Sequence, residues 1–283
     1  MKVIFLFVDG VGMRPPAVDN PVNPEVCPTL CRLIARHSVP IDACLGVDGL
    51  PQSATGQSTM FTGVNTPKFM GRHCEGFPGP SLRQLIEKDN LFLQLKQKNL
   101  RFRFADAYLV DTADELASRR FKSVTTVMAL TAPESISTES DLLDENAVMQ
   151  DLTRETVQDR RPDIPLITPE DAAEHLFSIA RAYDFTLFEF FQTDVAGHSM
   201  DYDRACGVLR SYDLFLAALT RLTEAAGITV MLTADHGNIE AMEERGHTRN
   251  PVPFVVFGPK EREIRAPVKS LADVTPAILR LWN

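Results

Sequence analysis

The sequence predicts an α/β fold in which a mostly parallel β-sheet is sandwiched between helices, with a small cap. Continuous apolar runs of six or seven residues, rich in β-branched and aromatic side chains, are typical of strands buried on both faces. Segments with helical periodicity and helix-start signals alternate with them. The chain has 283 residues, of which 44% are hydrophobic and 24% charged. We therefore expect residues 1–283 to form a single domain.

The predicted elements alternate along the chain. VIFLFV (3–8) indicates a buried parallel strand. A helix over 28–38 has Pro28 in its first turn, and a helix over 168–184 begins with Thr168 as N-cap. The other predicted strands cover 40–47, 101–109, 123–130, 185–191, 228–234 and 253–258, and the other helices cover 201–227, closed by Gly227, and 271–282.

Residues 66–165 differ from the rest because they are rich in proline, glycine and acidic residues. We interpret this segment partly as strands returning to the core and partly as a small, irregular cap.

Composition limits the partners. The formal net charge of −9 argues against non-specific nucleic-acid binding, which needs basic patches. An anionic substrate would need a local positive centre, such as a metal ion. No apolar run approaches the length of a membrane span, so we expect no membrane partner.

Five cysteines, an odd number, favour a reduced cytoplasmic protein, and packing explains Cys27 and Cys31 better than metal binding does. The oligomeric state stays open.

Acidic and histidine side chains stand where apolar runs end. Ligands of open parallel sheets bind outside the carboxyl ends of the strands, so we expect these side chains to meet at one edge. Asp and neutral His suit zinc or manganese. Each alone could cap a turn or helix, but together they predict a metal site. They are Asp9 after 3–8, Asp194 and His198 after 185–191, Asp235 and His236 after 228–234, and His247 before 253–258.

A nucleophile is predicted within GLPQSATGQSTMFTG (49–63), where small hydroxyl residues begin a helix after a strand. A hydroxyl at a helix N-terminus meets free backbone N–H groups, which favour phosphate. A nearby divalent ion lowers its pKa and prepares it for attack. Ser53, Thr55, Ser58 and Thr59 are the candidates, and spacing alone does not choose among them.

These motifs together resemble the alkaline phosphatase superfamily. The segments LFVDGVG, SATGQ…FTG, DVAGH, TADHGNIE and HTRNPVP are most similar to the branch of cofactor-independent phosphoglycerate mutase and phosphopentomutase. The resemblance implies an alkaline phosphatase-like core, Ser53 as nucleophile and two divalent metal ions. One ion would be held by Asp194, His198 and His247, and the other by Asp9, Ser53, Asp235 and His236.

The chain also departs from these relatives. It lacks the large second domain that the mutases carry after the nucleophile, and Gln57 stands where several relatives have His. The candidate substrate-binding residues Asn65, Lys68, Arg72 and His73 could equally be a solvated loop. We expect hydrolysis of a small phosphate monoester through a phosphoserine. The alternatives are a phosphomutase acting on a sugar or sugar acid, a phosphodiesterase or sulfatase, and a metal-binding protein without catalysis.

Overall fold

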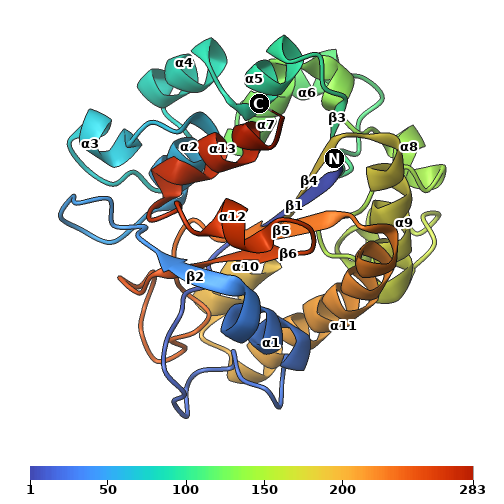
Figure 1. Ribbon diagram of the computed structural model, residues 1–283. Helices are drawn as coiled ribbons and strands as arrows, with labels where there is room; N and C mark the ends of the chain where they lie inside the picture. Colours follow the sequence, from blue (N-terminus) through green and yellow to red (C-terminus); the bar gives the residue numbers. More distant parts are fainter. Residues whose placement is uncertain (283) are drawn as a thin grey trace.

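The computed structural model describes residues 1–282, which contain one six-stranded sheet (Figure 1). The strand order is β2-β6-β5-β1-β4-β3. β1 pairs in parallel with β4 and β5, β3 pairs in parallel with β4, and β6 runs antiparallel to both β5 and β2. The predicted mostly parallel α/β fold is therefore confirmed. The strands are Val3–Val8 (β1), Ser38–Ile41 (β2), Phe102–Phe104 (β3), Phe185–Phe190 (β4), Thr229–Thr233 (β5) and Val252–Phe257 (β6).

Helices cover both faces of the sheet (Figure 1). One layer consists of α1 (Pro28–His37), α9 (Pro169–Ala182) and α11 (Tyr202–Ala226), and the other includes α2 (Ser53–Thr62), α7 (Val124–Leu130), α12 (Glu261–Arg265) and α13 (Val274–Leu279). The shorter helices are α3 (Thr66–Met70), α4 (Pro80–Lys88), α5 (Leu91–Gln97), α6 (Ala113–Ser118), α8 (Glu139–Leu143) and α10 (Gln192–Ser199).

The centre of the sheet fixes the position of α2. All six residues of β1 are buried, as a strand with neighbours on both sides and helices on both faces requires. Phe5 and Phe7 of β1 pack edge-on against Phe61 of α2, with ring centroids 6.2 and 5.9 Å apart. This aromatic contact packs the C-terminal turn of α2 against β1.

Three sequence predictions of strands are wrong in part or in full. Most of the strand expected over 123–130 is helix α7, because the Ser123 hydroxyl accepts a hydrogen bond from the Thr126 N–H (3.1 Å) and so caps a helix over 124–130. Of the strand expected over 101–109, only residues 102–104 form a strand, which is β3. The strand expected over 40–47 stops at Ile41, because the Asp42 carboxylate accepts the N–H groups of Cys44 and Leu45 and turns the chain.

The segment 66–165 is shared between the core and a smaller apolar cluster. It supplies β3 to the sheet, and α4 and α7 pack on α2. A second cluster of buried apolar side chains lies apart from the main core; it consists of Ala107, Leu142, Ala147, Met149, Val157 and Ile164. That this cluster marks a cap stays a prediction.

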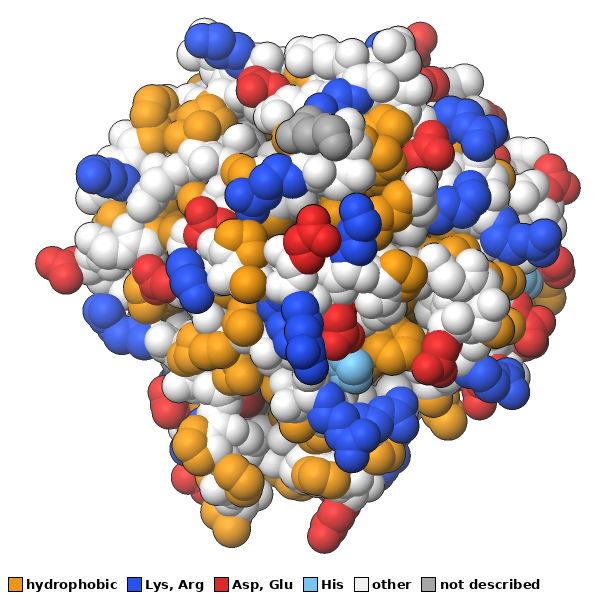
Figure 2. Space-filling view, in the orientation of Figure 1, with side chains coloured by type: hydrophobic (Ala, Val, Ile, Leu, Met, Phe, Trp, Pro, Cys, Tyr) orange, Lys and Arg blue, Asp and Glu red, His pale blue; other side chains and the backbone are white. Residues whose placement is uncertain are grey.

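The surface in Figure 2 mixes Lys and Arg side chains with Asp and Glu side chains over this face. Within residues 1–282, no helix combines the length and apolar character needed to cross a bilayer.

Candidate metal centre

The predicted metal-ligating side chains meet at one edge of the sheet. Asp9 follows β1, Asp235 and His236 follow β5, and α10 after β4 carries Asp194 and His198. β6 is antiparallel, so its first residues start at the edge where its parallel neighbours end. His247 therefore reaches the same edge from the segment before β6, where the Thr248 N–H donates to the Gly237 carbonyl (2.9 Å).

Asp194, His198 and His247 form a first group of convergent donor atoms. His198 Nε2 lies 3.3 Å from Asp194 Oδ2 and 3.2 Å from His247 Nε2, which is 3.7 Å from Asp194 Oδ1. Ligand atoms that surround a zinc ion tetrahedrally at about 2.1 Å lie about 3.4 Å from one another, so the spacing of these donor atoms suits zinc. His247 Nδ1 donates to the Pro51 carbonyl (2.8 Å), which leaves the lone pair of Nε2 free for a metal.

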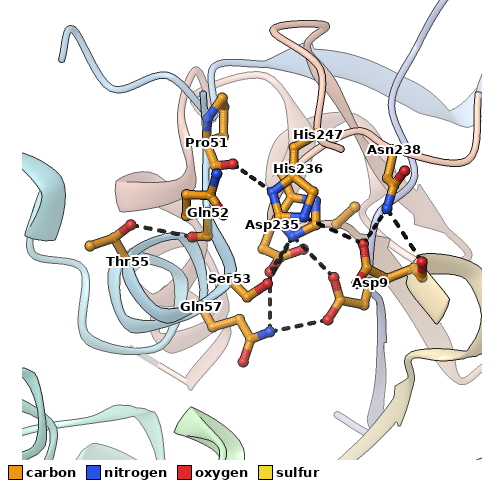
Figure 3. Close-up of polar contacts among 12 residues, drawn as sticks. Asp9, Pro51, Gln52, Ser53, Thr55, Gln57, Asp235, His236, Asn238 and His247 are labelled. Atoms are coloured by element: carbon orange, nitrogen blue, oxygen red, sulfur yellow. Dashed lines mark hydrogen bonds and ion pairs between the residues drawn. The ribbon is translucent and has the colours of Figure 1, made fainter. Parts of the chain in front are cut away.

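A second group of convergent donor atoms comes from Asp9, Asp194 and His236. His236 Nε2 lies 3.3 Å from Asp9 Oδ1, 3.5 Å from Asp235 Oδ2 and 3.0 Å from Ser53 Oγ (Figure 3). Asp194 thus contributes to both groups, whereas the resemblance assigns it to the first alone. Asp235 lies beside the second group rather than within it.

The charges at this site favour a cation. Burial, with Asp235 and Asp194 close by, raises the pKa of Asp9 well above its usual range, and burial raises the pKa of Asp235. Burial and the neighbouring His247 lower the pKa of His236 to about 3, so its imidazole is neutral, as a metal ligand must be. Within residues 1–282, Asp9 Oδ1, Asp235 Oδ1 and His236 Nδ1 are buried without hydrogen-bond partners. Divalent ions would balance these clustered carboxylates, so the donor set fits them.

Ser53 is the candidate hydroxyl that faces this site. It is the first residue of α2, and its Oγ points to His236 (Figure 3). The other three candidate hydroxyls donate to carbonyls of their own helix region: Thr55 to Gln52 (3.2 Å), Ser58 to Ala54 (2.6 Å) and Thr59 to Thr55 (2.8 Å).

Close packing fixes where Ser53 lies. A Cβ on Gly56 would lie 2.9 Å from the Asp235 carbonyl oxygen. Only glycine therefore lets the first turn of α2 touch the loop that carries Asp235 and His236.

Three supporting residues surround the donors. Gln57 Nε2 donates to Asp9 Oδ2 (3.2 Å) and Asp235 Oδ2 (3.1 Å), and Asn238 Nδ2 donates to Asp194 Oδ1 (2.6 Å). The buried Glu240 carboxylate accepts from four donors: the Gly12 N–H (2.9 Å), the Asn238 N–H (2.9 Å), Thr248 Oγ1 (2.6 Å) and Asn250 Nδ2 (3.0 Å). The sequence reasoning missed Asn238 and Glu240, although both lie within the quoted motif TADHGNIE.

A cavity of about 480 Å³ adjoins Ser53, and Asp9, Gln57 and Asp194 line the same end. The four predicted substrate-binding residues do not line it. Asn65 caps α3 by accepting the Lys68 N–H (3.1 Å), and the Lys68 side chain is exposed. Arg72 and His73 border a separate pocket of about 300 Å³ beside Gln52.

Known proteins share this fold and parts of the sequence. The 2,3-bisphosphoglycerate-independent phosphoglycerate mutase of Dinoroseobacter shibae is 35% identical over 46% of this chain, and that of Agrobacterium fabrum is 33% identical over 37%. These matches cover 29% and 22% of the relatives' own lengths, so the chain matches less than a third of each.

Solved structures resemble the whole chain. Alkaline phosphatase from the Antarctic bacterium TAB5 has a TM-score of 0.57 at 12% identity and covers 100% of this chain and 98% of its own. The cold-active alkaline phosphatase of Shewanella sp. has a TM-score of 0.58 at 12% identity, with 100% of both chains covered. The sequence profile of the Metalloenzyme superfamily matches residues 1–283. The chain has an alkaline phosphatase-like fold and belongs to the Metalloenzyme superfamily.

Proposed function

We propose that the chain is a metal-dependent phosphoryl-transfer enzyme that hydrolyses a small phosphate monoester through a phosphoserine at Ser53. One observation carries this proposal: Ser53 Oγ lies 3.0 Å from His236 Nε2, beside two groups of convergent Asp and His donor atoms. Membership of a metalloenzyme family supports it.

We assign two divalent ions, zinc or manganese, to the donors at this edge. Asp194, His198 and His247 would hold one ion, and Asp9, Ser53, Asp235 and His236 the other, with Asp194 in reach of both. Such ions would neutralise the phosphoryl oxygens and lower the pKa of the Ser53 hydroxyl.

Ser53 supplies the nucleophile in the proposed reaction. Its Oγ gives up its proton and forms a bond to phosphorus as the bond from phosphorus to the leaving-group oxygen breaks, and that oxygen keeps the electron pair and takes a proton. A water oxygen then bonds to phosphorus as the bond from phosphorus to Ser53 Oγ breaks, so inorganic phosphate leaves and Oγ regains a proton. In the first turn of α2 the Thr55 N–H donates to the Cys74 carbonyl (3.3 Å), so the N–H groups of Ser53 and Ala54 are the ones that would stabilise the negative charge of the phosphate.

A phosphomutase is the second candidate, because the curated relatives named above are mutases. A mutase returns the phosphoryl group to another hydroxyl of its substrate and must exclude water. Steady-state assays with an aryl phosphate separate the two candidates, since a strict mutase would hydrolyse it very slowly. Phosphodiester and sulfate ester substrates in the same panel test the remaining hydrolase variants.

The deciding experiment compares Ser53→Ala with Ser58→Ala after each divalent metal is added back to stripped protein. Ser53→Ala should abolish aryl phosphate hydrolysis while metal content stays near two per chain. Ser58→Ala should retain activity, because that hydroxyl donates to the Ala54 carbonyl within α2. Full activity in Ser53→Ala would remove Ser53 from the mechanism. Metal binding without turnover of any ester by the unmodified protein would leave a non-catalytic metal-binding protein.

We also infer a reducing, cytoplasmic location. All five cysteines are free thiols, including Cys27 and Cys31, whose sulfurs are 3.9 Å apart.

A further inference from the structure

The cavity beside Ser53 has an unusual lining for a protein that handles phosphate esters. Of the described residues that line it, none is Lys, Arg or His. Ser53, Asp9 and Asp194 lie at one end, which the phosphate would occupy, so the leaving group must lie along the remainder.

Two buried carboxyl groups face this remainder. Asp106 and Glu189 are each 7% exposed, and both line the cavity. Asp106 Oδ2 accepts the Glu189 N–H (2.8 Å), and Glu189 Oε2 accepts the Thr125 hydroxyl (2.6 Å). Neither carboxyl group forms an ion pair with any residue in 1–282. These hydrogen bonds use Asp106 Oδ2 and Glu189 Oε2, so Asp106 Oδ1 and Glu189 Oε1 can accept hydrogen bonds from a ligand.

Aromatic side chains also line this cavity. Phe77 and Phe121 stack on each other with centroids 5.5 Å apart, although they are 54% and 61% exposed. Phe104, Tyr108 and Phe191 line the cavity as well. An exposed aromatic pair beside a cavity offers a flat apolar surface on which a ring can lie.

We propose, resting on the phosphatase function above, that the substrate is the phosphate monoester of an uncharged, hydroxyl-bearing ring alcohol, such as a sugar or nucleoside. Its hydroxyl groups donate to Asp106 and Glu189, and its ring lies against Phe77 and Phe121. Phosphates of sugar acids are rejected, because their carboxylate would lose water beside two carboxyl groups with no cation to pair with it.

The first test compares glucose 1-phosphate with glucuronic acid 1-phosphate, which differ only by CH₂OH and COO⁻. Assayed above about pH 8, where Glu189 is mostly ionised because its pKa is about 7, the acid should have a kcat/KM roughly 10- to 100-fold lower, because its carboxylate then lies close to a like charge. Asp106→Asn and Glu189→Gln should each bring the kcat/KM values of the two substrates closer together. Glu174→Gln, an exposed change on α9, should leave it unchanged.

The second test concerns the ring. Phe77→Ala and Phe121→Ala should each raise KM for glucose 1-phosphate by about 3- to 10-fold, the size of one aromatic contact. KM for glycerol 3-phosphate, which has no ring, should stay the same. Phe69→Ala is the matched control, because Phe69 is 58% exposed but lies on α3, outside the cavity. A nucleoside 5′-monophosphate assayed alongside shows which of the two ring alcohols is preferred.

Three results would overturn this inference while the proposed function stands. The first is hydrolysis of glucuronic acid 1-phosphate as fast as that of glucose 1-phosphate, or faster. The second is hydrolysis of aryl phosphate but of neither glucose 1-phosphate nor the nucleoside 5′-monophosphate. The third is an equal loss of kcat/KM for glucose 1-phosphate and glucuronic acid 1-phosphate in Asp106→Asn and Glu189→Gln. The last result would mean that these carboxyl groups act on the phosphate end rather than on the leaving group. Absence of aryl phosphate hydrolysis would overturn the proposed function itself, and the inference with it.

Discussion

Asp194 is held by a neutral side chain. Asn238 Nδ2 donates to Asp194 Oδ1 (2.6 Å) and to its carbonyl oxygen (3.3 Å), so the carboxylate that reaches both donor groups has a fixed orientation. Partners of this kind orient metal ligands, and their loss lowers metal affinity.

We predict that Asn238→Ala weakens metal binding by about 10- to 100-fold, because Asp194 loses its fixed orientation. Isothermal titration of metal-stripped protein measures the affinity. Asn146→Ala serves as the control, because Asn146 is exposed and is not among the residues of the metal centre. Unaltered affinity in Asn238→Ala would show that Asp194 needs no such support.

The sequence could predict the charged residues of the site but not their neutral supports. Asp9 and Asp235 stand out because each follows a long apolar run, and such positions lie at one edge of a parallel sheet. Asn238 gives no such signal, since its partner Asp194 is 44 positions away. Glu240 looks like an ordinary exposed acid until the fold places four donors around it.

Glu240 connects three segments of the chain. It accepts hydrogen bonds from the segment after β1, from the loop after β5 and from the segment before β6. We predict that Glu240→Gln lowers the free energy of unfolding by about 1–3 kcal/mol, because an NH₂ group then faces buried donors. Urea unfolding measures the change, and the exposed Glu243→Gln is the control. A difference below 0.5 kcal/mol between the two variants, which is about the size of an ordinary surface substitution, would contradict this role.

Helix α2 meets the loop after β5 at Gly56. We predict that Gly56→Ala lowers both activity and stability, the latter by about 1–3 kcal/mol, because its Cβ would overlap the Asp235 backbone. Gly207→Ala on α11 is the matched control. Its Cβ would meet no atom within 4 Å, so a gain of about 0.5–1 kcal/mol is expected. Similar behaviour of the two variants would show that the contact at Gly56 is not tight.

Element type and direction were harder to predict than the alternation of elements. Residues 124–130 are rich in β-branched side chains, which favour a strand, yet the Ser123 cap and packing against α2 and α4 give a helix. The reversed direction of β6 follows from strand pairing, which a single sequence does not display. This reversal places His247 at the metal site although it precedes its strand.

At the scale of the whole molecule, burial makes the carboxyl group of Glu189 hold its proton up to nearly neutral pH. Burial raises the pKa of Glu189 to about 7, whereas an unfolded Glu has a pKa of about 4.3. Between these values the folded state binds the extra proton, so the contribution of Glu189 to stability falls as pH rises.

We predict that the stability of metal-stripped protein relative to its Glu189→Gln variant decreases as pH rises from about 5 to about 8. Urea unfolding of both proteins at each pH measures the difference, and the opposing contribution of His236 cancels in the comparison. A difference that grows with pH would mean that Glu189 is ionised at low cost in the folded protein.

The central claim is that side chains from the segment after β1, from α2 and α10, from the loop after β5 and from the segment before β6 hold two cations beside the Ser53 hydroxyl. The most direct test is anomalous X-ray diffraction from crystals of the metal-loaded protein, recorded at the absorption edge of the added metal. We predict two peaks, one between Asp194, His198 and His247 and one beside Asp9, His236 and Ser53 Oγ. A single peak away from Ser53, or no peak among these residues, would contradict the account.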